Sequence, residues 1–150
     1  MTQNLIASAP KRIAVDFDGT LCDMEHPGIG AIKPNAREAL TLFRALGFKI
    51  IIWSCRTCHW DYGIYGGDRE QPTLERGRVK AMAAWLNANG IPYDEIDDGS
   101  KGKPHANLYV DDKGYRFNDN WDEIMAFVKE KLLEPRRRNE DLRNNPPGDQ

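Results

Sequence analysis

Cysteine, net charge and long apolar runs are all scarce in this chain. Its 150 residues include only three cysteines, an odd number that does not suit a disulfide framework. The formal net charge is -2, so there is no overall basic field that would make nucleic acid the main partner. No apolar run is long enough to cross a bilayer. These absences exclude a disulfide-stapled scaffold, a generally basic nucleic-acid-binding protein and a helical membrane protein.

The composition is that of an ordinary globular domain, with 40% hydrophobic and 29% charged residues. The first residues lack the basic start and apolar core of a signal peptide, so we expect a cytoplasmic protein. The length suits one hydrophobic core, which we expect within a single domain over residues 1–134. Residues 135–150 carry mixed charges and one large apolar side chain, Leu142, and are expected to form a disordered tail.

Apolar strands alternate with amphipathic helices along this domain. We expect strands over residues 13–17, 48–53, 93–96 and 108–110, and helices over residues 35–46, 73–89 and 120–133, each helix with one apolar face. Alternation of this kind favours an α/β fold with right-handed crossovers. The predicted fold is a Rossmann-like three-layer sandwich with a mainly parallel sheet.

Two carboxylates, Asp16 and Asp18, follow the first strand in the run KRIAVDFDGTL. Strand alternation points them to one side and Phe17 to the other for as long as the strand geometry lasts. Neighbouring acids repel each other, which a fold tolerates when a cation lies between them or when they share a chemical task. An ordinary polar turn explains the same residues, and the DxD pattern alone does not decide between the two interpretations.

The other strands end on polar residues as well. In parallel sheets, ligands bind beyond the carboxyl ends of the strands, so these side chains are expected to converge on one rim. The rim would hold Asp16, Asp18, Ser54, Asp111 and Asp112, with Lys103 entering from the loop before the last strand. Hard oxygen ligands without a histidine cluster suit Mg²⁺, and Mg²⁺ held by carboxylates normally serves a phosphate. A hydroxyl and an ammonium would stabilise the phosphoryl oxygens, and a second acid would move protons.

The four segments together resemble the motifs of the haloacid dehalogenase-like (HAD) superfamily of phosphohydrolases. Asp16 and Asp18 in DFDGTL match its first motif, and Ser54 at the end of IIIWS matches its second. Lys103 matches the third motif, and Asp111-Asp112 in YVDDK match the fourth. The similarity covers about residues 12–130, and the run KPHANLYVDD resembles the small members with a minimal cap.

This resemblance implies a role for each matching residue. Asp16 would be the nucleophile that forms an aspartyl-phosphate, and Asp18 the general acid and base. Mg²⁺ would be held by Asp16, the backbone carbonyl of Asp18 and Asp111, with Asp112 in or near that shell. Ser54 would bind the phosphoryl group, and Lys103 would neutralise the nucleophile and the phosphate. Asp18 favours ester hydrolysis over dehalogenation, since a leaving alkoxide needs a proton.

Several assignments stay open at the level of the sequence. Lys101 is an alternative to Lys103, and the pair Asp97-Asp98 an alternative to Asp111-Asp112, although an apolar strand leads only into the second pair. Arg56 follows Ser54 closely and is a candidate for binding a substrate anion, because its planar fork suits phosphate. A surface salt bridge explains Arg56 equally well.

The run Cys55-Arg56-Thr57-Cys58-His59 spells CxxCH, the pattern of c-type haem attachment. Without an export signal, haem is disfavoured, and a zinc site lacks a second spaced pair of ligands. Thiols that pack or line the pocket are the preferred interpretation. The loop over residues 55–72 lies at the correct end of its strand to cover the rim, and its aromatic rings would either stack on a substrate or form a small hydrophobic cluster.

We therefore expect a Mg²⁺-dependent phosphatase that hydrolyses a phosphate monoester through an aspartyl-phosphate. The alternatives are a phosphotransferase on the same scaffold and a non-catalytic module that binds Mg²⁺ and phosphate. The expected partner is a small-molecule ester such as a sugar phosphate or nucleotide, with a phosphorylated nucleic-acid end as a second option and no membrane. Relatives of this type often exclude solvent by oligomerising, so a homo-oligomer is expected.

Overall fold

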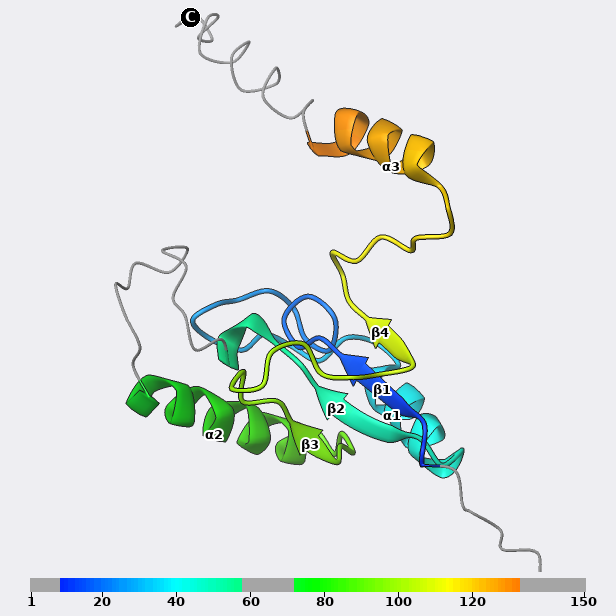
Figure 1. Ribbon diagram of the computed structural model, residues 1–150. Coiled ribbons are helices and arrows are strands. Elements are labelled where there is room, and N and C mark those ends of the chain that lie inside the picture. Colours follow the sequence, from blue (N-terminus) through cyan, green and yellow to red (C-terminus); the bar gives the residue numbers. More distant parts are fainter. Residues whose placement is uncertain (1–8, 58–71, 133–150) are drawn as a thin grey trace, which may run out of the picture. The chain divides into compact units, whose positions relative to one another are not determined.

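The computed structural model describes residues 9–57 and 72–132. The chain divides into two compact units, Met1–Asp112 and Lys113–Gln150. The first unit holds a four-stranded parallel sheet in the order β3-β2-β1-β4, seen in Figure 1. Its strands are β1 (Arg12–Val15), β2 (Lys49–Ile52), β3 (Glu95–Ile96) and β4 (Leu108–Val110). The predicted α/β, Rossmann-like fold is confirmed.

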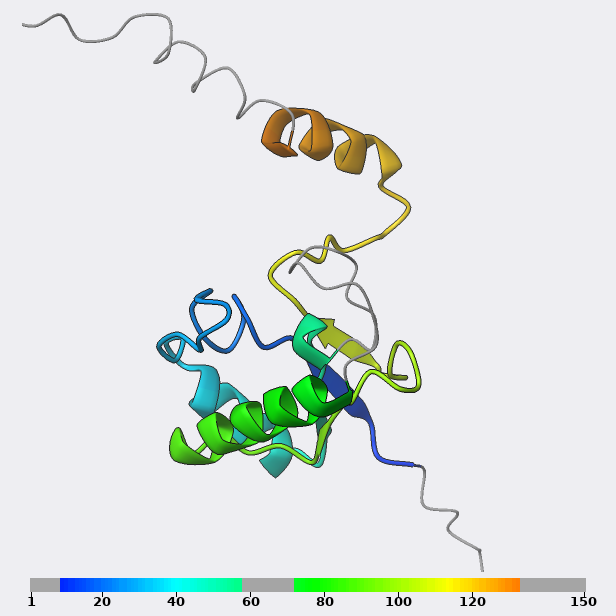
Figure 2. The same ribbon diagram turned by 90° about the vertical axis from the view of Figure 1, so that its left-hand side faces the viewer.

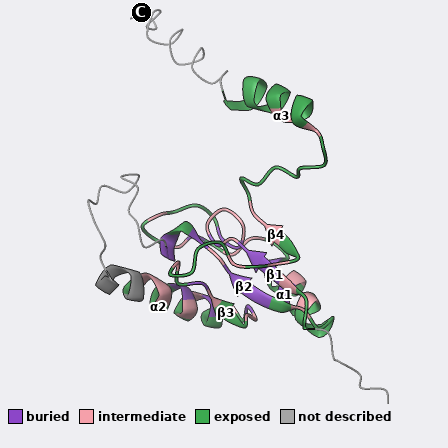
Figure 3. Cartoon of the chain, in the orientation of Figure 1, coloured by how far each residue is buried: buried purple, intermediate pink, exposed green. Residues whose placement is uncertain are grey.

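Two helices, α1 (Ala36–Ala45) and α2 (Pro72–Ala88), pack on the same face of the sheet, which we call the helix face. The alternating residues Ile13 and Val15 of β1 share one hydrophobic core with Leu40 of α1 and Met82 of α2. The buried residues of this core surround the two central strands (Figure 3). The apolar run in β2 is buried on both faces, as expected for a central parallel strand.

Helix α1 ends where the sequence predicts, and Gly47 terminates it with a φ of 87°. The amide of Gly47 donates to the Arg44 carbonyl, and the amide of Phe48 donates to the Phe43 carbonyl. Leu46 is 64% exposed because it already lies outside the helical repeat as the C-cap residue.

The order in which the chain adds strands to the sheet reverses after β3. Strands β2 and β3 are added in turn on one side of β1, and β4 is added on its other side. Right-handed crossovers from β1 to β2 and from β2 to β3 place α1 and α2 on one face. The connection from β3 to β4, residues 97–107, crosses the opposite face, which we call the loop face (Figures 1 and 2). The reversal makes the carboxyl ends of β1 and β4 the topological switch point, where open α/β sheets bind their ligands.

The second unit contains α3 (Trp121–Phe127), continued by one π-helical turn over Val128–Leu132. The predicted helix is present, but none of the residues of α3 is buried. Its aromatic side chains instead pair locally, with ring centroids 5.2 Å apart for Tyr115 and Phe127. None of the helices in the described residues is long and apolar enough to span a membrane. Most of the 55–72 loop, and the expected tail over 135–150, lie outside the described residues.

Candidate active site

Three carboxylates meet at the switch point. Asp16 follows β1 directly, and its amide donates to the Val110 carbonyl of β4 at 2.9 Å, which carries the strand pairing one residue further. Asp111 and Asp112 follow β4, and carboxylate oxygens of these three residues all lie within 4.8 Å of one another. The spacing matters because like charges at this separation repel strongly unless a proton or a cation intervenes.

The ionisation of Asp16 reflects this setting. Burial, together with the charges of Asp111, Asp112 and Asp18, raises the pKa of Asp16 to about 6, against an ordinary value of 3.8. The hydrogen bond from the Phe17 amide acts in the opposite direction. Desolvation and like charge together make this carboxylate the most perturbed acid among the described residues, as is typical of functional sites.

The Gly19-Thr20 turn fits closely against Asp112. Gly19 has a φ of 87°, and a Cβ atom at this position would lie 2.5 Å from the Asp112 Oδ2. The Thr20 hydroxyl accepts a hydrogen bond from the Asp112 amide at 3.1 Å. Glycine is therefore needed here both for the backbone conformation and for space. The turn after β1 fixes the position of an acid that follows β4.

Asp18 does not join the three-carboxylate cluster, because the strand geometry of β1 ends at Val15. Both of its carboxylate oxygens accept hydrogen bonds from Arg56, at 2.5 Å from Nε and 2.6 Å from Nη2. Such a bidentate pair is strong and directional. The side chains of Arg56 and Asp18 are 6% and 12% exposed, so solvent screens the pair weakly.

Arg56 also binds the loop that follows the first motif. Its Nη1 donates to the Pro27 carbonyl at 3.0 Å, and Nη2 donates to the Gly28 carbonyl. The guanidinium carbon lies 5.8 Å from the centroid of the Phe17 ring. Four of the five N–H donors of Arg56 are thus used, one on Nε, one on Nη1 and two on Nη2. Arg56 thus connects the end of β2 with the turn at Asp18 and with the loop at Pro27 and Gly28.

The sequence left Arg56 open between a surface salt bridge and a group that binds a substrate anion. The structure shows a buried ion pair with Asp18, and substrate binding by Arg56 stays a prediction. Because Arg56 follows Ser54 by two residues, the sequence predicts that it lies near the site. It does not predict the pair with Asp18, which lies 38 positions away in the sequence. An arginine at the end of a buried strand, close to an acidic turn, is the signal that could have predicted the pair.

Ser54 lies at the end of β2, is 6% exposed and faces the first turn of the following 3-10 helix (Cys55–Thr57). Its hydroxyl oxygen accepts a hydrogen bond from the Arg56 amide at 3.2 Å, and its carbonyl accepts one from the Thr57 hydroxyl at 2.8 Å. The hydroxyl is therefore held in place by the backbone that carries Arg56. Of the CxxCH run, Cys55 is exposed, and Cys58 and His59 lie outside the described residues.

Lys103 lies on the loop face, over two aromatic rings. Its ammonium is 4.2 Å from the centroid of Tyr109 and 5.9 Å from that of Trp53. The charge of Lys101 instead helps to lower the pKa of Asp98, within the loop that follows β3. Lys103 is thus the lysine that the fold brings to the strands of the site.

The second acidic pair serves the loop after β3. The Asp97 carboxylate accepts a hydrogen bond from the Gly99 amide at 2.7 Å, and Asp98 accepts from the amide and hydroxyl of Ser100. These local bonds shape a turn at the sheet edge. The three-carboxylate cluster contains Asp111 and Asp112, as the apolar strand before them suggested.

The donor set at the switch point fits Mg²⁺. It consists of carboxylate oxygens that already converge, and their mutual repulsion is what a divalent cation would relieve. Among the described residues no soft ligand belongs to this set, and the buried Cys22 thiol donates to the Phe17 carbonyl at 3.5 Å. Burial, together with the charge of Asp18, raises the pKa of this thiol to about 11, which keeps it protonated and inert.

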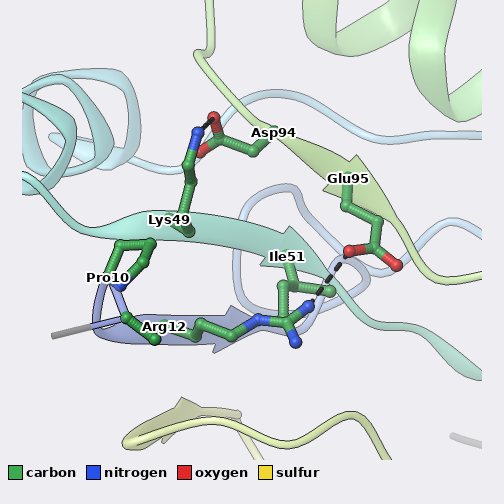
Figure 4. A pocket seen from close by; sticks show the side chains of 7 residues that line it. Pro10, Arg12, Lys49, Ile51, Asp94 and Glu95 are labelled. Atoms are coloured by element: carbon green, nitrogen blue, oxygen red, sulfur yellow. Dashed lines mark hydrogen bonds and ion pairs between the residues drawn. The ribbon is translucent and has the colours of Figure 1, made fainter. Parts of the chain in front are cut away.

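A hollow of about 430 Å³ lies at the amino ends of the strands, the opposite end of the sheet from the carboxylate cluster (Figure 4). Charged side chains line it, but they form ion pairs with one another, Arg12 with Glu95 at 3.0 Å and Lys49 with Asp94 at 3.1 Å. The backbone and the neighbouring lysine lower the pKa of Asp94 against the effect of burial. This end of the sheet is stabilised by paired charges and holds no counterpart of the carboxylate cluster.

No protein-family model and no curated protein matches this chain. Among solved structures, a conserved protein from Bacteroides thetaiotaomicron matches with 24% identity and a TM-score of 0.47, over 82% of this chain and 93% of that one. A crystal structure from Vibrio cholerae matches with 27% identity and a TM-score of 0.47, over 81% and 99%. A chain of the Pnkp1/Rnl/Hen1 RNA repair complex matches with 20% identity and a TM-score of 0.41, over 83% and 33%. Likenesses this weak carry no argument about function.

Proposed function

We propose that this protein is a Mg²⁺-dependent phosphatase that hydrolyses a phosphate monoester through an aspartyl-phosphate on Asp16. One observation carries the proposal. A half-buried carboxylate lies at the switch point of an α/β sheet, beside two further acids, and has a pKa of about 6. The motifs that resemble the HAD superfamily support the same reaction.

Asp16, Asp111 and Asp112 would hold the cation, together with the backbone carbonyl of Asp18. When bound, Mg²⁺ supplies charge screening between these carboxylates and an anionic phosphoryl group. The protein's own contribution is the fixed position of each acid. The Thr20 hydroxyl and the space left by Gly19 hold Asp112, and the Val110 carbonyl holds the backbone of Asp16.

In the first half-reaction, a carboxylate oxygen of Asp16 attacks phosphorus, and the bond from phosphorus to the ester oxygen breaks. The leaving oxygen takes a proton from Asp18 and departs as an alcohol. In the second half-reaction, Asp18 takes a proton from water as the water oxygen attacks phosphorus. The bond to Asp16 breaks, phosphate leaves, and both acids return to their starting forms.

Asp18 must exchange partners during this cycle. Both of its oxygens accept hydrogen bonds from Arg56, and a carboxylate held in this way has no proton to give. The protonated form keeps one oxygen on Arg56 and turns the other, with its proton, towards the leaving group. Arg56 then acts as a positioning residue for the general acid, and its bonds to Pro27 and Gly28 keep the first loop beside that acid.

The same pair supports a second candidate, the non-catalytic module. If Arg56 never releases Asp18, the site would bind Mg²⁺ and phosphate without turnover. A phosphotransferase differs only in the acceptor, which would be an alcohol in place of water. The substrate class stays open between sugar phosphates, nucleotides and phosphorylated ends of larger molecules.

Phosphate release from a panel of sugar phosphates, nucleotides and an aryl phosphate tests the proposal. We expect release that requires Mg²⁺, stops with a chelator and is lost in Asp16→Asn. Asp98→Asn is the matched control, because it removes an acid from the loop after β3 and should keep the activity. If no ester is hydrolysed while the protein still binds phosphate with Mg²⁺, the non-catalytic module replaces the phosphatase. Product analysis with added alcohols separates hydrolysis from transfer.

A further inference from the structure

Trp53 and Tyr109 bring their rings together across the central strand. Tyr109 lies in β4, and Trp53 follows β2, with its amide donating to the Val15 carbonyl at 2.9 Å. Neighbouring strands are about 4.8 Å apart, so β2 and β4, on either side of β1, are separated by about 10 Å. The ring centroids are nevertheless only 5.8 Å apart, in an edge-to-face arrangement. Both rings therefore lean over β1.

A small residue in β1 permits this contact. Ala14 is the register partner of Tyr109, and its side chain lies on the loop face because its neighbours Ile13 and Val15 belong to the core of the helix face. Ala14 is 1% exposed although α1 and α2 both pack on the opposite face. We call Trp53, Tyr109 and Ala14 the aromatic platform.

Lys103 lies on this platform. Its ammonium is 4.2 Å from the centroid of Tyr109 and 5.9 Å from that of Trp53, within the range of cation–π attraction. The Tyr109 hydroxyl donates to the carbonyl of Pro104 at 2.6 Å, which fixes the backbone next to Lys103. The two rings and this bond thus contribute to holding Lys103 in its position.

Ala14 and Tyr109 lie one step below the acids, and Trp53 lies level with Asp16 in the strand register. Asp16 follows Ala14 by two residues in a continued strand pairing, so its side chain extends from the same face, about 6.6 Å further along. Asp111 follows Tyr109 in the same way on β4. A lysine side chain spans that distance by changing rotamers. The platform therefore places Lys103 within reach of the carboxylate cluster.

We propose that Trp53 and Tyr109 are positioning residues, whose rings hold the Lys103 ammonium beside the carboxylate cluster so that it meets an incoming phosphoryl group. This inference rests on the proposed function. Without the rings, the lysine would spread over solvent-exposed rotamers or fall onto the acids, where it would compete with the cation. The platform avoids both by offering the ammonium a neutral but attractive surface.

A double-mutant cycle on stability tests whether the platform binds the ammonium. The variants are Tyr109→Leu, Lys103→Met and the double variant, compared by urea unfolding with chelator present. We expect a coupling of about two- to five-fold in the unfolding constant, the size of an exposed cation–π contact. Tyr109→Phe keeps the ring and should retain the coupling, although it loses the bond to Pro104. The control cycle pairs Tyr109→Leu with Lys101→Met, which should be uncoupled.

The second measurement is the affinity of the same variants for inorganic phosphate with Mg²⁺. Tyr109→Leu should weaken phosphate binding by about two- to five-fold when Lys103 is present and leave it unchanged in Lys103→Met. Equal losses in both backgrounds would overturn the inference, as would a wild-type protein that binds no phosphate. Coupled phosphate binding without turnover of any ester would support the platform and refute only the hydrolase. Turnover without coupling would refute only the platform.

Discussion

Replacing the proposed nucleophile should stabilise the metal-free protein. Burial raises the pKa of Asp16 from 3.8 to about 6, so the folded chain binds this proton more tightly than the unfolded chain does. The favourable contribution of the protonated form is fully present below pH 4 and is lost as the pH rises through about 6. At neutral pH the ionised carboxylate opposes folding, and Asp16→Asn removes that opposition.

The size of the effect follows from the shift. A difference of about two pKa units corresponds to roughly 3 kcal/mol as an upper limit, at about 1.4 kcal/mol per unit. Solvent reaches the half-buried carboxylate, so we expect a gain of about 1–2 kcal/mol for Asp16→Asn at pH 7, in the range found for relieved strain at active sites. The gain should vanish near pH 4, and it corresponds to several degrees in Tm.

The gain is measured by urea unfolding of the wild type and Asp16→Asn between pH 4 and pH 8, first with chelator and then with Mg²⁺. Mg²⁺ should stabilise the wild type and have little effect on Asp16→Asn. The difference in unfolding free energy between the two proteins should therefore become smaller or change sign. Asp98→Asn is a control of opposite sign, because hydrogen bonds from Ser100 lower the pKa of Asp98, and its loss should destabilise the protein at neutral pH. A pH-independent difference, or an Asp16→Asn variant that is less stable at pH 7 without metal, would refute the reasoning.

Two further substitutions test the geometry of the site by urea unfolding. Arg56→Met removes the partner of the Asp18 carboxylate and should lower the unfolding free energy by about 3–5 kcal/mol. Arg12→Met breaks an exposed pair and should lower it by no more than about 1 kcal/mol. Equal losses would contradict the buried arrangement. Gly19→Ala and Gly47→Ala share a φ of 87°, but only the first brings a Cβ atom to 2.5 Å from Asp112, while the second meets nothing within 4 Å. We expect about 1 kcal/mol for Gly47→Ala and about 1–3 kcal/mol more for Gly19→Ala, and similar values for the two would argue against the close contact.

The sequence predicts the sheet and the first two helices well, because their signals are local. The unbroken apolar run of β2 marks a strand buried on both faces, and Gly47 marks the end of α1. The alternation of strands and helices is enough to predict parallel pairing. It also predicts that Asp16 and Asp111 meet, since both follow strands that end at the same edge of the sheet.

The remaining features depend on contacts that no local pattern contains. The pairing of Arg56 with Asp18 joins residues on different strands, and the strand geometry that would have aligned Asp18 with Asp16 ends at Val15. The exposure of α3 is a second case, since an amphipathic pattern indicates that a helix has an apolar face but not what covers it. The roles assigned to the site residues, Ser54 and Lys103 among them, stay predictions.

The central claim is a covalent phosphoryl group on Asp16, and acid-quenched labelling tests it most directly. The protein is mixed with Mg²⁺ and a ³²P-labelled ester that it hydrolyses, quenched in acid and digested. We expect label on the peptide that contains Asp16 and none in Asp16→Asn. With an aryl phosphate, whose leaving group needs no proton, Asp18→Asn should carry more label because water is no longer activated. Phosphate release without any labelled peptide, or label that persists in Asp16→Asn, would contradict the account.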